Sequence, residues 1–215
     1  MRNVRSVHRT GVAVLVNEVF YTLQGEGFWT GRAAVFCRFA RCNLWTGREE
    51  DRKSAICTFC DTDFTASAKY TEAELVDKII DVWPTGAPNP MVVFTGGEPL
   101  LQLSASLISQ LQQFGFYVAV ETNGTQRLPG PVDWVCVSPK ADTMINIPRG
   151  DELKLVFPQE LAPPNRFEHL DFKTFWLSPM DGPNLEENTR SAIEYCLRRP
   201  QWRLNIQTHK VIGVR

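Results

Sequence analysis

The sequence predicts an α/β fold: a single domain built as an open, partial βα barrel with mostly parallel strands and few helices. Apolar runs rich in β-branched and aromatic residues alternate with helical patterns, which is typical of parallel βαβ units. The helical patterns are too few for a complete eight-fold barrel. The expected strands lie at about 12–18, 33–39, 91–95, 117–121, 133–138, 152–157, 173–178 and 202–206.

The second expected strand has a clear alternation of side chains. In "AVFCRFA", Val35, Cys37 and Phe39 share one face, and Arg38 points to the other. A surface salt bridge is one interpretation of Arg38, but the apolar character of the strand argues against it.

Three helical patterns follow. The stretch "YTEAELVDKIIDVW" opens with Thr71 and places Glu74 three residues later, which makes a capping box. Two further helices are expected at about 103–114 and 185–198. The first helix carries an apolar stripe at helical spacing, formed by Leu75, Val76, Ile79 and Ile80.

Polar loops recur where the later strands end. They read "VVFTGGEP" (92–99), "AVETNGT" (119–125) and "CVSPKAD" (136–142). The paired glycines of the first loop allow a ligand to approach the backbone closely, although an ordinary strand-to-helix turn would also explain them. Because the carboxyl ends of parallel strands meet at one edge of a sheet, these loops predict one composite pocket.

Composition narrows the class of protein. The 215 residues carry a net charge of −1, which argues against a dedicated nucleic-acid surface. There is no run of eighteen apolar residues and no signal-peptide pattern, so we expect no membrane span and a cytoplasmic location. The basic residues 1–11 are expected to form a flexible tail before a domain that spans 12–215.

The six cysteines divide into two groups. Three lie within apolar strand or helix patterns and are expected to pack in the core: Cys37, Cys136 and Cys196. The other three flank a loop rich in charge, where burial does not explain them: Cys42, Cys57 and Cys60.

Three kinds of site remain open for the second group. A structural zinc site normally needs four ligands, and the histidines are distant in sequence from this loop. A redox Cys-x-x-Cys pair would leave Cys42 without a role. A 4Fe-4S cluster bound by three thiolates would keep one iron open for a small molecule.

Eight motifs in order resemble the 7-carboxy-7-deazaguanine synthase family of the radical S-adenosylmethionine (radical SAM) superfamily. They are "FYTLQGEG", "AVFCRFARCNLW", "CTFCDTDF", "TGGEP", "ETNG", "VSPKAD", "SPMDGP" and "NIQTHK". Fourteen residues separate the first two cysteines, where the superfamily usually has three, but a subset of this family carries such an insertion. The resemblance implies a partial barrel of the radical SAM type with a cluster loop at 42–60.

The resemblance also implies the cofactors. Cys42, Cys57 and Cys60 are expected to hold a 4Fe-4S cluster whose open iron binds S-adenosyl-L-methionine, the source of a 5′-deoxyadenosyl radical. Glu98 is a candidate partner for the amino group of this cofactor and Glu121 for its ribose. The remaining positions implied for cofactor binding are Phe59, Cys60, Asp61, Gly97, Ser138, Pro139, Lys140, Ser178, Pro179, Met180 and Asp181.

The implied reaction is that of a carbon–nitrogen lyase. It contracts the ring of 6-carboxy-5,6,7,8-tetrahydropterin to 7-carboxy-7-deazaguanine with release of ammonia, in the biosynthesis of queuosine and other 7-deazapurines used in tRNA modification. Thr62 is the implied Mg²⁺ ligand, with Asp61 and Asp63 as alternatives. The positions implied for substrate binding are Leu23, Gln24, Gly25, Glu26, Arg38, Thr95, His209 and the carboxylate of Arg215.

An external electron donor and a homodimer are further implied by the resemblance. Two other functions stay open at this point. One is a radical SAM activating enzyme that generates a glycyl radical on a partner protein. The other is a zinc-binding interaction module.

Overall fold

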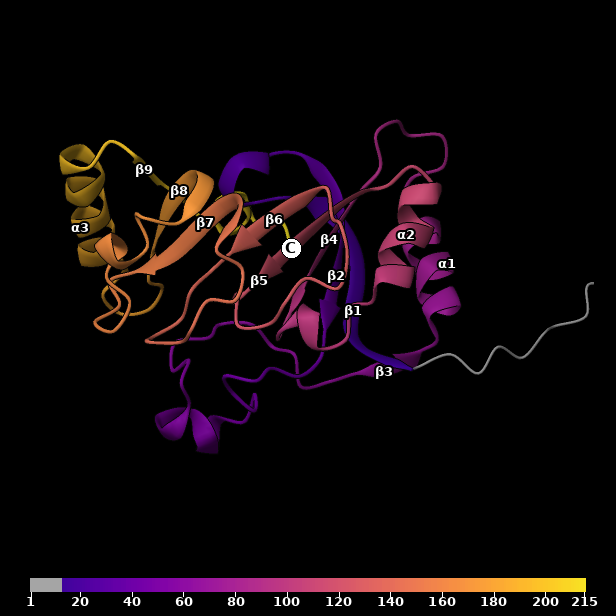
Figure 1. Ribbon diagram of the computed structural model, residues 1–215, viewed down its shortest axis with the longest axis horizontal. Helices are drawn as coiled ribbons and strands as arrows, with labels where there is room; N and C mark the ends of the chain where they lie inside the picture. Colours follow the sequence, from indigo (N-terminus) through magenta and orange to yellow (C-terminus); the bar gives the residue numbers. More distant parts are fainter. Residues whose placement is uncertain (1–12) are drawn as a thin grey trace, which may run out of the picture.

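The computed structural model describes residues 13–215, so the tail expected at 1–11 lies outside the described residues. Nine strands form one sheet in the order β3-β1-β2-β4-β5-β6-β7-β8-β9 (Figure 1). The strands are β1 (Val14–Leu23), β2 (Ala33–Phe39), β3 (Ala68–Tyr70), β4 (Met91–Gly96), β5 (Tyr117–Thr122), β6 (Trp134–Val137), β7 (Arg149–Phe157), β8 (Asp171–Pro179) and β9 (Trp202–Leu204). The α-helices are α1 (Glu72–Val82), α2 (Ala105–Gln113), α3 (Leu185–Arg198) and α4 (Thr208–Ile212).

Strand pairing confirms the predicted fold class. From β2 to β9 every neighbouring pair in the sheet is parallel, whereas β1 pairs with both β2 and β3 in antiparallel fashion. The connection from β1 to β2 spans only residues 24–32, which is too short for the crossover that parallel strands need, so these two strands pair in antiparallel fashion. The short elements β3 and α4 were not predicted.

Helices α1, α2 and α3 cover one face of this sheet. The capping box predicted at Thr71 is present: its side chain accepts from the backbone of Glu74, whose carboxylate accepts from the backbone of Thr71. In Figure 1, α1 and α2 lie together at one end of the sheet and α3 lies at the other. The main core lies under them and includes Val35, Cys37 and Phe39, as predicted from their alternation.

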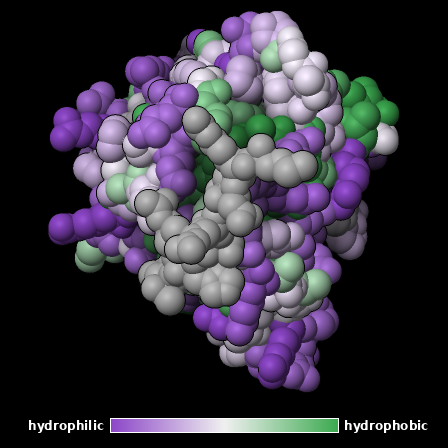
Figure 2. All heavy atoms as spheres, turned by 90° about the vertical axis from the view of Figure 1, so that its right-hand side faces the viewer, coloured by the Kyte–Doolittle hydropathy of each residue, from purple (hydrophilic) through white to green (hydrophobic). Residues whose placement is uncertain are grey.

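The end of the molecule that bears α1 and α2 is turned toward the viewer in Figure 2. Apart from the part covered in grey, hydrophilic side chains dominate this surface. On α1 the exposed positions include Asp77, Lys78 and Asp81, opposite the buried Leu75 and Ile79. The helix is therefore amphipathic, as its apolar stripe predicted. In residues 13–215, no helix has the length and apolar character needed to cross a membrane.

The other face of the sheet has two levels. Near the amino ends of the strands it is apolar, with Phe36, Val93 and Ala119 in a second core cluster. Two residues further along each strand, the same face carries Arg38, Thr95 and Glu121, which line a cavity. Alternation of side chains thus places polar groups at the carboxyl ends of the strands, above an apolar base.

Candidate active site

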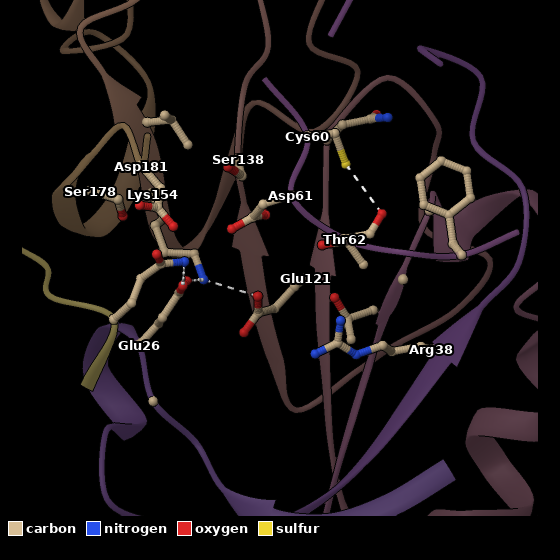
Figure 3. Close-up of a pocket in the computed structure, with 18 of the residues that line it drawn as sticks. Glu26, Arg38, Cys60, Asp61, Thr62, Glu121, Ser138, Lys154, Ser178 and Asp181 are labelled. Atoms are coloured by element: carbon tan, nitrogen blue, oxygen red, sulfur yellow. Dashed lines mark hydrogen bonds and ion pairs between the residues drawn. The ribbon is translucent and has the colours of Figure 1, made fainter. Parts of the chain in front are cut away.

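A cavity of about 360 Å³ opens at the carboxyl ends of the parallel strands (Figure 3). Its volume suits a small-molecule ligand. Most of the predicted site residues line it: Leu23, Gln24, Gly25, Glu26, Arg38, Cys42, Cys57, Phe59, Cys60, Asp61, Thr62, Thr95, Gly97, Glu121, Ser138, Lys140, Ser178, Pro179, Met180, Asp181, His209 and Arg215. Glu98 and Pro139 lie outside its wall.

The three loop cysteines reach this cavity from two sides of one loop. Cys42 follows β2, and its Sγ accepts a hydrogen bond from the backbone N–H of Leu44 at 3.4 Å. Cys57 and Cys60 form a hydrogen-bonded pair, which lowers the pKa of the Cys60 thiol to about 6 and raises the pKa of Cys57. All six cysteines of the described residues are free thiols. Three soft donors therefore converge on one cavity, and one of them is readily ionised.

The donor set also bears on the kind of metal centre. Among residues 13–215, no group of three or more His, Cys, Asp or Glu side chains is placed to hold one ion. A structural zinc site normally takes four protein ligands, whereas a 4Fe-4S cluster bound by three thiolates leaves one iron open. Three thiols that face one cavity therefore suit a cluster with one open iron.

The long insertion between Cys42 and Cys57 is held in place by Arg52. Its guanidinium donates to the carbonyls of Thr58 and Cys60, both at 3.0 Å. The same group lies over the ring of Trp45, 4.1 Å from the centroid, and Trp45 packs edge-on against Phe64. The charged loop thus carries its own internal contacts, which the sequence analysis did not anticipate.

The glycine pair at the end of β4 packs against the backbone that leads into Cys42. Gly96 has a φ of 116°, a conformation that favours glycine. A Cβ on Gly97 would lie 1.9 Å from the carbonyl oxygen of Arg41, and one on Gly96 would lie 2.2 Å from that of Phe39. The two glycines are therefore needed for close backbone packing beside the cluster loop. The sequence predicted that the glycines let a ligand approach the backbone. Gly97 lines the cavity, so a ligand there could approach it.

Glu98 has a different environment from the one expected. Its carboxylate is fully buried and accepts hydrogen bonds from the Thr122 hydroxyl at 2.7 Å and the backbone N–H groups of Asn123 and Leu100 at 2.8 and 3.0 Å. Burial raises the pKa of Glu98, against the opposing effect of these donors. The geometry thus assigns Glu98 to the link between the loops after β4 and β5 and not to the cavity wall.

Arg38 and Arg215 meet at one end of the cavity. The Nε of Arg38 lies 3.2 Å from Glu18, which also pairs with the guanidinium of Arg215. Both guanidinium groups lie over the ring of Phe20, at 5.5 and 4.6 Å from the centroid. The hydroxyl of Thr22 donates to the main-chain oxygen of Arg215 at 2.8 Å. Arg215 is thus held against β1, and Arg38 both forms an ion pair with Glu18 and lines the cavity.

The α4 segment closes another side of the cavity. Its Lys210 bridges Asp61 and Asp181 at 2.9 and 2.5 Å, and this contact holds the pKa of Asp181 below its usual range. His209 packs against Gly25 so closely that a Cβ there would lie 2.1 Å from its Nδ1. The terminal "QTHK" motif therefore meets the "LQGEG" turn, as two halves of one wall.

Of the two carboxylates considered as alternatives to Thr62, neither is free of protein contacts. Asp61 pairs with Lys210, and Asp63 accepts from the backbone and hydroxyl of Thr65 at 2.9 and 2.8 Å. Thr62 itself lines the cavity beside Cys60.

Sequence reasoning missed Lys154, which lies deep in the cavity. It is only 6% exposed, and its Nζ contacts Glu26 at 2.6 Å and Glu121 at 2.9 Å. The two carboxylates raise its pKa well above the usual value, although burial opposes them. A lysine within the apolar run "LKLVF" was the available signal, of the same kind as Arg38 in its strand.

An open βα barrel with a polar, thiol-bearing cavity at its carboxyl ends defines this chain as an α/β protein with an enzyme-like active site. No family model matches the chain. It is 56% identical over 206 residues to the 7-carboxy-7-deazaguanine synthase of Bradyrhizobium diazoefficiens, and the aligned region covers 93% of this chain and 98% of that protein. It is 54% identical over 209 residues to that of Bordetella pertussis, covering 94% and 100%.

A solved structure agrees with these relatives. The crystal structure of QueE from Escherichia coli superimposes with a TM-score of 0.70 at 29% identity, covering 92% of this chain and 95% of that chain. The chain therefore belongs to the 7-carboxy-7-deazaguanine synthase family of enzymes.

Proposed function

We propose that this protein is a carbon–nitrogen lyase that converts 6-carboxy-5,6,7,8-tetrahydropterin to 7-carboxy-7-deazaguanine and ammonia. The observation that carries the proposal is that three free thiols and several polar side chains line the same cavity, which is large enough for a small-molecule substrate. Membership of the synthase family supports the same reaction. No specific observation favours a glycyl-radical activating enzyme or a zinc-binding module.

The donor set fits the cofactors implied by this reaction. Cys42, Cys57 and Cys60 would hold a 4Fe-4S cluster as thiolates. The cluster and S-adenosyl-L-methionine would supply the radical that removes a hydrogen atom from the substrate. Around them the chain supplies Phe59, Asp61, Gly97, Glu121, Ser138, Lys140, Ser178, Pro179, Met180 and Asp181 as cavity-lining groups.

The other end of the cavity suits a flat heterocycle that bears a carboxylate. The planar guanidinium of Arg38 can make two parallel hydrogen bonds to a carboxylate or to a ring oxygen. Glu26, anchored by Lys154, is an acceptor for the donors of the guanidine-like edge of the pterin. Leu23, Gln24, Gly25, Thr95, His209 and Arg215 complete this end.

Thr62, which lines the cavity, is our candidate ligand for Mg²⁺. A hydroxyl oxygen with substrate oxygens and waters suits this ion, which prefers oxygen ligands.

We further propose that a single domain spans 12–215 and acts in the cytoplasm as a homodimer. It would receive electrons from an external donor and have no direct contact with nucleic acid.

Iron content after anaerobic purification tests the proposed cofactor. The reconstituted protein should be brown and contain about four irons per chain. Colourless protein with one zinc and no iron under these conditions would favour the zinc-binding module. Turnover of the carboxypterin separates the synthase from an activating enzyme, because the latter has no use for this small molecule.

A further inference from the structure

Lys154 connects two parts of the cavity that come from distant elements. It projects from β7, while Glu26 lies in the turn after β1 and Glu121 lies near the end of β5. Figure 3 shows the lysine between the two carboxylates, with its Nζ 2.6 Å from Glu26 Oε2 and 2.9 Å from Glu121 Oε2. Because both oxygens contact one buried nitrogen, the two carboxylates lie close together.

Each carboxylate is also held through its second oxygen. Gln207 donates to Glu26 Oε1 at 2.8 Å, and Gln24 donates to Glu121 Oε1 at 2.8 Å. The side-chain oxygen of Gln24 in turn accepts from the backbone N–H of Glu26 at 3.2 Å. Lys154 thus completes a closed network in which one side chain faces the proposed substrate and another faces the proposed cofactor.

The charges around this network make the lysine necessary. Burial raises the pKa of Glu26, but the charge and hydrogen bond of Lys154, with smaller effects of Gln207 and His209, lower the pKa to about 2. Other titratable groups near the lysine are Cys136 on β6 and Glu152 on β7, while Lys140 adds a more remote positive charge. Without Lys154, two neighbouring, partly buried carboxylates would repel each other and would lose the donor that they share.

We propose that Lys154 is a positioning residue that holds the carboxylates of Glu26 and Glu121 in place, and so couples the substrate end of the cavity to the cofactor end. The assignment of the two ends rests on the proposed function. Lys154 acts through the two carboxylates. When one of them has been replaced, the loss of Lys154 should therefore affect only the ligand that the other carboxylate contacts.

The test measures two dissociation constants on the anaerobic, reconstituted enzyme, one for the carboxypterin and one for S-adenosyl-L-methionine. Glu26→Gln should weaken the carboxypterin alone, and Glu121→Gln should weaken S-adenosyl-L-methionine alone, each by about tenfold for one charge-assisted hydrogen bond. Lys154→Met should weaken both. Lys173→Met, which removes an exposed lysine paired with Asp151, is the control and should change neither constant.

Double variants separate positioning from general support of the fold. They also remove one positive and one negative charge together, so they stay testable if Lys154→Met alone does not fold. In the Glu121→Gln background, Lys154→Met should weaken the carboxypterin about tenfold and leave S-adenosyl-L-methionine unchanged. In the Glu26→Gln background, the same substitution should do the reverse.

Equal losses of both affinities in both backgrounds would show a purely structural role and overturn the proposal, as would unchanged affinities. A wild-type enzyme that neither binds nor converts the carboxypterin would instead overturn the proposed function. In that case S-adenosyl-L-methionine alone tests Lys154: in the Glu26→Gln background, Lys154→Met must still weaken the binding of S-adenosyl-L-methionine.

Discussion

Replacing Glu98 by alanine should destabilise the fold and leave cofactor affinity nearly unchanged. The carboxylate accepts three hydrogen bonds from Thr122, Asn123 and Leu100, and each donor would be left buried without a partner. Each unpaired buried donor costs roughly 1 to 3 kcal/mol. The substitution also removes the cost of burying a carboxylate away from water, which offsets part of this loss. We therefore expect a loss of about 3 kcal/mol in the free energy of unfolding.

Urea denaturation followed by circular dichroism under anaerobic conditions measures this loss. With a slope of about 3 kcal/mol per molar urea, the midpoint should fall by about 1 M. Glu98→Gln should lose less, since its amide oxygen still accepts from at least one donor. The reasoning fails if Glu98→Ala keeps the wild-type midpoint while S-adenosyl-L-methionine no longer binds, because the carboxylate would then face the cofactor.

Four further predictions concern the cavity. Cys42→Ala, Cys57→Ala and Cys60→Ala should each abolish turnover and iron binding, whereas Cys37→Ala, Cys136→Ala and Cys196→Ala should cost about 1–2 kcal/mol of stability and retain iron; an active, iron-loaded Cys42→Ala enzyme would contradict this division. Thr62→Ala should lower turnover more than it lowers S-adenosyl-L-methionine binding, and chelation of Mg²⁺ should have the same effect; an unchanged rate after chelation would exclude the metal. Arg38→Lys, and separately a C-terminal extension beyond Arg215, should weaken carboxypterin binding without loss of cluster absorbance; normal substrate affinity in both would refute the assignment of this end of the cavity. Because the pKa of Glu26 falls from 4.5 to about 2 on folding, its pairing contributes stability above pH 4.5 that is lost as the pH falls toward 2; denaturation midpoints should therefore drop more steeply over this interval in the wild type than in Glu26→Gln, and parallel curves would contradict the pairing.

The strands were predictable because alternation and β-branched runs extend over several residues. The strand from Ala33 to Phe39 carries the whole argument in its sequence: one face packs in the core, and Arg38 on the other lines the cavity. The strand of three residues at Ala68–Tyr70 and the helix of five at Thr208–Ile212 are too short for a period to be recognised.

The cysteine trio was predictable because three thiols around a charged loop have no packing explanation. The roles of Lys154 and Glu98 were not, since each depends on contacts between strands that are distant in sequence. Lys154 meets its carboxylates only after the turn following β1 and the end of β5 come together, and Glu98 is saturated by groups from the loop after the next strand. Composition and the spacing of residues along the chain do not show which distant segments become neighbours in the fold.

Product formation is the most direct test of the central claim that this cavity is the site of a synthase. The reconstituted enzyme, supplied anaerobically with a reductant, S-adenosyl-L-methionine, Mg²⁺ and 6-carboxy-5,6,7,8-tetrahydropterin, should form 7-carboxy-7-deazaguanine and ammonia in equal amounts. Because S-adenosyl-L-methionine is regenerated in the proposed reaction, product should exceed the 5′-deoxyadenosine released. An iron-loaded enzyme that cleaves S-adenosyl-L-methionine but leaves the carboxypterin unchanged would contradict the account.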